Sequence, residues 1–67
     1  SCLGQDSIDT VLRGDVIYLY KSGLILERLH MKDDQVDIKV IYVYRDGVLV
    51  RREWWQRGER ISWTMDN

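Results

Sequence analysis

Tryptophan and arginine residues gather in one short stretch of this 67-residue chain. Arginine can form paired hydrogen bonds with carboxylates or phosphates, and both residue types are frequent hot spots of protein interfaces. Both can also stack on the bases of single-stranded nucleic acid. The stretch therefore predicts a binding surface for a protein partner, or alternatively for a nucleic acid, formed by Arg51, Arg52, Trp54, Trp55, Arg57 and Arg60.

Each of these side chains also has a plainer interpretation. Strand alternation would turn one of Trp54 and Trp55 inward, and we expect at least one of the two to be exposed. Trp63 is in phase with Ile61 and Met65, which predicts that it belongs to the core. The arginines could instead form a solvated face that nearby glutamates balance.

Four tyrosines form a second aromatic group: Tyr18, Tyr20, Tyr42 and Tyr44. A ladder of such rings could stack on a base, a sugar or a proline. The alternative is ordinary cross-strand packing with the hydroxyls reaching solvent.

Groups for catalysis or metal binding are sparse. One Cys and one His cannot make a disulfide or a structural zinc site. Asp33, Asp34 and Asp37 lack the acidic spacing of a calcium loop and indicate a solvated turn. The sequence shows no nucleophile–base pair, phosphate loop or paired-carboxylate motif. We therefore predict a non-enzymatic protein that needs no metal or cofactor.

Cys2 allows two interpretations. It could be the lipid-acceptor residue of a bacterial lipoprotein, or it could be an ordinary thiol. Lipidation would place the protein in the bacterial envelope, and without it we expect a cytoplasmic location. No run of residues approaches the roughly 20 apolar residues of a membrane-spanning helix.

An internal repeat indicates the elements that position these groups. Val16–Arg28 reads VIYLYKSGLILER and returns 24 positions later, at Val40–Arg52, as VIYVYRDGVLVRR. Each copy has an apolar run, a Gly-containing turn and a second apolar run, which is the pattern of a β-hairpin. Two-residue turns would place Tyr20 opposite Ile25 and Leu19 opposite Leu26, with the equivalent pairs Tyr44 with Leu49 and Val43 with Val50 in the second copy.

The same patterning predicts five strands joined as an antiparallel meander, at roughly 15–20, 24–31, 36–45, 48–55 and 59–65. The third of these is apolar on both faces, which requires a second layer: barrel closure, a helix or another subunit. Ile8, Val11 and Leu12 share one face of a short predicted helix over 7–13 that Gly14 would end.

We thus expect an all-β domain with one short N-terminal helix. Residues 1–14 would form a tether and the helix, and residues 15–67 a five-stranded curved sheet or small barrel with a duplicated hairpin. The stretch LRGDVIYLYKSGLIL (Leu12 to Leu26) resembles the first helix-to-strand segment of Sm-like RNA chaperones, and the predicted element order resembles Sm-like and SH3-like barrels. The repeated Tyr-x-Tyr-x-x-Gly pattern resembles hairpins of the MORN type. These resemblances imply a small β fold, and no functional residue carries over.

Charge and size restrict the function. The net charge of −1 argues against nonspecific binding to polyanions, although residues 45–60 hold five arginines against three acidic residues. A chain this short buries little surface by itself and often depends on a partner chain. We therefore expect a small, self-associating protein-interaction module that binds through the Trp/Arg-rich surface. The alternative is a small-barrel nucleic-acid-binding protein that uses arginine for phosphates and tyrosine or tryptophan for bases.

Overall fold

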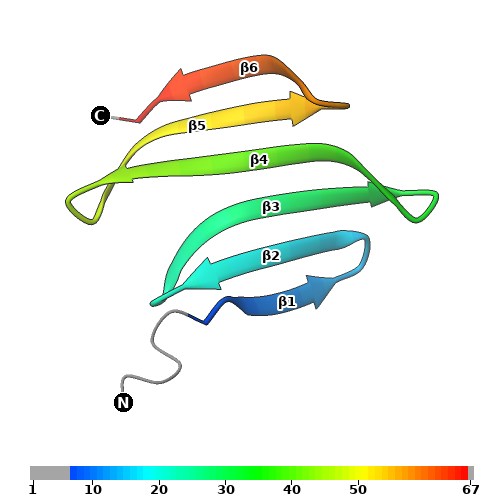
Figure 1. Cartoon of the computed structure of the whole chain (residues 1–67), viewed down its shortest axis with the longest axis horizontal. Coiled ribbons are helices and arrows are strands. Elements are labelled where there is room, and N and C mark those ends of the chain that lie inside the picture. The colour runs from blue at the N-terminus through cyan, green and yellow to red at the C-terminus, as the bar shows by residue number, and fades with distance from the viewer. Residues whose placement is uncertain (1–6, 67) are drawn as a thin grey trace.

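The computed structural model describes residues 7–66, which form one antiparallel sheet of six strands in sequence order (Figure 1). The candidate lipid-acceptor Cys2 and most of the predicted tether lie outside the described residues. The strands are β1 (Asp9–Arg13), β2 (Val16–Lys21), β3 (Leu24–Lys32), β4 (Gln35–Arg45), β5 (Val48–Gln56) and β6 (Glu59–Met65). The predicted all-β meander is confirmed.

The first strand replaces the helix that the sequence predicted over 7–13. Val11 pairs with Tyr18 of β2, and Leu12 pairs with Ile17. Gly14, at φ 58°, begins a tight turn between the two strands instead of ending a helix. An isolated helix of this length is marginal in water, whereas pairing with β2 gives the segment a complete ladder. The sheet therefore has six strands and not five.

The sheet is open, so of the two forms predicted, a curved sheet or a small barrel, the barrel is wrong. β1 and β6 are the two edges, and each pairs with one neighbour only. Figure 1 shows the strands side by side in one layer, with no element over either face among the described residues. The molecule measures 38 × 30 × 18 Å along its principal axes.

Each consecutive pair of strands from β2 to β6 is joined by a tight turn. In four successive turns both central residues have positive φ, as a type I′ turn requires. These turns are Ser22-Gly23, Asp33-Asp34, Asp46-Gly47 and Arg57-Gly58. Their backbone twist matches that of the strands they join, so each strand returns beside the one before it.

Each of these turns is followed by a β-bulge in the outgoing strand. The register leaves Leu26, Asp37, Val50 and Ile61 as the extra residues. The predicted pair Tyr20–Ile25 is therefore correct, whereas Leu19 lies opposite Glu27 and not opposite Leu26. The second hairpin behaves in the same way, with Tyr44 opposite Leu49 but Val43 opposite Arg51. A bulge adds local twist and redirects the side chains that follow it.

The repeat seen in the sequence extends to the backbone. The first unit consists of turn 22–23 with β3 and turn 33–34 with β4. The second unit consists of turn 46–47 with β5 and turn 57–58 with β6. Turns and bulges both recur after 24 residues. The bulge residue Leu26 corresponds to Val50, and Asp37 corresponds to Ile61. The sheet thus grows by units of two strands.

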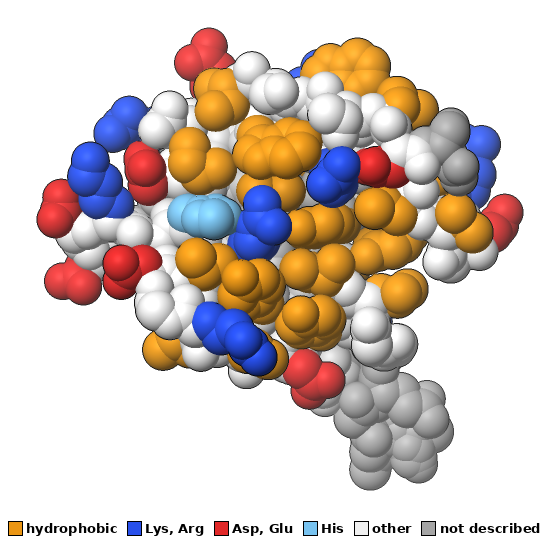
Figure 2. All heavy atoms as spheres, turned by 180° about the vertical axis from the view of Figure 1, so that it is seen from behind, with side chains coloured by type: hydrophobic (Ala, Val, Ile, Leu, Met, Phe, Trp, Pro, Cys, Tyr) orange, Lys and Arg blue, Asp and Glu red, His pale blue; other side chains and the backbone are white. Residues whose placement is uncertain are grey.

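The pairing register divides the side chains between two faces. The aromatic face carries Tyr18, Tyr20, Tyr42, Tyr44 and Trp54. Figure 2 shows this face, recognisable by the single histidine of the chain. The aliphatic face, on the other side, carries Leu12, Ile17, Leu19, Leu29, Ile41 and Val43, together with Trp55 and Trp63. Val40, at 0% exposure, is the only fully buried side chain among the described residues.

The turn at Gly47 gives a direct test of this backbone. Gly47 has φ 79°, and an added Cβ would meet no atom within 4 Å, so a substitution costs conformational energy and not a clash. We expect Gly47→Ala to lower the free energy of unfolding by about 1–2 kcal/mol in urea denaturation. Gly47→Asn should cost less, because Asn tolerates positive φ. Equal stability of the alanine variant and the native chain would contradict the assigned turn.

Candidate functional site

The structure divides the predicted Trp/Arg surface between the two faces of the sheet. Arg52 and Trp54 lie on the aromatic face, because their partners in β4 are Tyr42 and Val40. The side chains of Arg51, Trp55 and Arg60 lie on the aliphatic face, and Arg57 is in the turn between β5 and β6. Trp54 and Trp55 are both half-buried, so the expectation that one of them would be exposed is not met.

On the aromatic face, Arg52 is held in place by one carboxylate and one ring. Its Nε and Nη2 each donate a hydrogen bond of 2.9 Å to the Asp66 carboxylate. Its guanidinium carbon lies 5.5 Å from the centre of the Trp54 ring, within the range of a cation–π contact. The hydrogen bond to Asp66 raises the pKa of Arg52. This arginine is thus already occupied by groups of its own chain.

On the aliphatic face, a second group of side chains converges on Glu53. Its carboxylate accepts hydrogen bonds from Arg51 Nε at 2.8 Å and from Trp55 Nε1 at 3.0 Å, and Arg60 Nη1 lies 3.7 Å away. The side chain of Glu53 is only 10% exposed. The hydrogen bond from Trp55 and the positive charges of Arg51 and Arg60 lower the pKa of Glu53 despite its burial. Glu53, Arg51, Trp55 and Arg60 are called the Glu53 cluster below.

An exposed tryptophan stands directly beside this cluster. Trp63 of β6 is the cross-strand partner of Glu53 and is 51% exposed. Ile61 and Met65, on the same strand, are 51% and 58% exposed. The prediction that these three residues belong to the core is wrong, because β6 is an edge strand and no layer covers either face among the described residues. Alternation correctly placed Trp63 and Met65 on one face, but Ile61 is the bulge residue of β6 and lines a hollow on the aromatic face with Trp54.

Exposed apolar side chains are concentrated on the aliphatic face. Among the described residues, nine large apolar side chains are exposed, and the register places six of them on this face. The other three are Ile8, which precedes β1, Val11 on the aromatic face, and the bulge residue Ile61, which lines a hollow on the aromatic face. The six are Leu12, Leu24, Val36, Val48, Trp63 and Met65.

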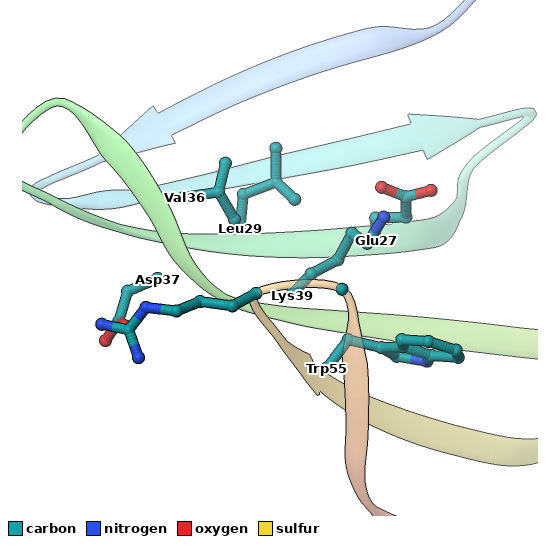
Figure 3. Close-up of a pocket in the computed structure, with 8 residues that line it drawn as sticks. Glu27, Leu29, Val36, Asp37, Lys39 and Trp55 are labelled. Carbon is teal, nitrogen blue, oxygen red and sulfur yellow. The ribbon is translucent and has the colours of Figure 1, made fainter.

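A shallow groove of about 410 Å³ crosses the same face over β3, β4 and β5. Leu29, Val36 and Trp55 supply its apolar lining. Figure 3 shows the Glu27 and Lys39 side chains next to each other in this groove. At one end, Arg57 Nη2 lies 4.0 Å from the Asp37 carboxylate. The groove therefore combines an apolar floor with two acidic side chains, Glu27 and Asp37, and two basic ones, Lys39 and Arg57.

The four tyrosines all lie on the aromatic face and are half-buried. Tyr44 donates its hydroxyl proton to the Ile25 carbonyl oxygen at 2.8 Å, and burial raises the pKa of this phenol. That bond links the start of β3 to the end of β4, next to the turns 22–23 and 46–47, which fits the packing interpretation of Tyr44.

The other predicted candidates occupy structural positions. Asp33 and Asp34 are the central residues of a turn, and both have positive φ. Within residues 7–66, no group of three or more His, Cys, Asp or Glu side chains could hold a metal ion. Arg28 Nε donates a hydrogen bond of 2.9 Å to His30 Nε2 on the aromatic face.

Neither family models, curated protein sequences nor solved structures match this chain. In the described part of the chain, no helix is long and apolar enough to span a membrane. The function must therefore be inferred from the geometry of the sheet and its two faces.

The lowered pKa of Glu53 predicts how stability depends on acid. A carboxyl group whose pKa is lower in the folded state stabilises the fold above its unfolded pKa, about 4.3. That contribution is lost as the pH falls through the lower, folded pKa. We expect Glu53→Gln to be less stable than the native chain at pH 7 and to lose less stability between pH 7 and pH 3. Melting temperatures of both proteins between pH 7 and pH 3 would measure this difference. Parallel curves would contradict the stabilising role of the Glu53 carboxylate.

Proposed function

We propose that this chain is a non-enzymatic protein-interaction module that docks through its aliphatic face. The observation that carries the proposal is the exposed apolar pair Trp63 and Met65 beside the Glu53 cluster. Tryptophan and arginine at the centre of an interface contribute most of its binding energy. A contiguous apolar surface of this kind on a small domain usually indicates a contact with another protein.

The Glu53 cluster prepares this surface for binding. Arg51 and Arg60 are already oriented by one carboxylate, and Trp55 is fixed by its hydrogen bond to that same group. Side chains that are ordered before association lose less conformational entropy when a partner covers them. Trp63 can therefore act as an anchor with a pre-ordered rim on one side.

The nucleic-acid alternative has less support. Arg51, Arg52 and Arg60 are engaged by carboxylates of their own chain, and they do not share one face. Phosphate binding would have to displace those pairs. The Arg57 side chain is 80% exposed, but it lies 4.0 Å from the Asp37 carboxylate, and a chain of net charge −1 gives little attraction for a polyanion. If Cys2 carries a lipid, the docking partner would be a protein of the bacterial envelope.

Site-specific photocrosslinking tests the proposed face. A benzophenone amino acid replaces Trp63 in one variant and Thr64 in the other, in cells that express the protein. Both positions are exposed on β6, but they point to opposite faces of the sheet. We expect protein adducts from position 63 at several times the yield from position 64.

Equal yields from the two positions, or no adduct from position 63, would refute docking through the aliphatic face. The mass of an adduct identifies its partner. An adduct with a foreign protein and an adduct with a second copy of this chain would both support docking through this face.

A further inference from the structure

We infer that the aliphatic face is covered by a second copy of this chain, docked face to face, with Glu27 of each copy paired to Lys39 of the other. The inference rests on the proposed function, because it names the occupant of the same face. It draws on the size of the face, on the position of its charges and on the near-neutral charge of the chain.

The face is large enough for a stable dimer. The sheet extends over 38 × 30 Å, whereas a standard stable interface buries about 800 Å² on each partner. A sheet that is apolar on both sides normally packs against a second layer. Since the described residues provide one layer only, a second copy is the simplest source of the other.

Two charged side chains in the middle of the face form no ion pair in the described part of their own chain, although they lie near each other. Within residues 7–66, neither the Glu27 carboxylate nor Lys39 Nζ has a hydrogen-bond or ion-pair partner. The two residues are diagonal neighbours on β3 and β4, since Glu27 pairs with Ile41 and Lys39 pairs with Leu29. They share the groove that Leu29 and Trp55 line.

Covering this groove with an apolar partner would bury both charges while neither forms an ion pair, at a high cost. A two-fold dimer removes that cost. In an isologous interface, a contact of residue i with residue j is always matched by j with i. One Glu27–Lys39 contact across the interface therefore brings a second one, and all four charges are paired. A net charge of −1 per chain adds little repulsion between copies.

Charge reversal at these two positions gives a sharp test. We expect the native protein to be a dimer by light scattering, and Glu27→Lys and Lys39→Glu each to weaken association by about tenfold or more, because like charges then face each other. An equimolar mixture of the two variants should restore the dimer. In that heterodimer, both contacts again join an acid to a base. Thr64→Lys, on the opposite face, is the control and should stay dimeric.

The mixture distinguishes contacts between copies from contacts within one copy, since an intramolecular effect cannot be repaired by mixing. The double variant Glu27→Lys/Lys39→Glu should also dimerise, which guards against loss of fold in a single variant. A monomeric native protein, or a mixture that stays monomeric while each variant melts cooperatively, would overturn the inference. Foreign-protein adducts from position 63 without self-adducts would also overturn it, and would leave docking through the aliphatic face intact.

Discussion

Each inner strand is hydrogen-bonded on both sides, but residues 7–66 place no covering layer over either face of the sheet. Side chains are buried by neighbours on their own face, and Val40, at the centre of the aromatic face, is the only described side chain that is completely enclosed. Hydrophobic stabilisation scales with apolar area removed from water. A single layer of this size therefore gains little from burial, and the partner that we propose for the aliphatic face would add to its stability.

The repeating unit explains how the candidate surface arises. Turns with two positive φ values and the bulges that follow them recur every 24 residues, so the two units share one backbone plan. Their side chains differ where the site lies. Leu29 and Met31 of the first unit occupy the positions that Glu53 and Trp55 occupy in the second. The Glu53 cluster is thus a feature that the second unit adds to a common scaffold.

The local elements could be predicted from the sequence, because the turn at Asp46-Gly47 and the β-branched runs around it have strong preferences. β1 could not, since Val11 and Leu12 suit a short helix as well as an edge strand. The sequence gives no clear signal for the bulges. The observed strand pairing beyond each turn therefore differs by one residue from the predicted pairing. The position of Trp63 on the aliphatic face followed from alternation. Its exposure depends on whether a second layer exists, which alternation alone does not encode.

If a second copy covers the aliphatic face, as we infer, folding of the sheet is coupled to dimer formation. The most direct measurement is the urea midpoint of unfolding, followed by tryptophan fluorescence, over a hundredfold range of protein concentration. If folding is coupled to dimer formation, the midpoint must rise with concentration, because a hundredfold increase adds about 2.7 kcal/mol to the apparent stability of a dimer. A midpoint that does not change with concentration would show that the single layer is stable alone and would contradict this account.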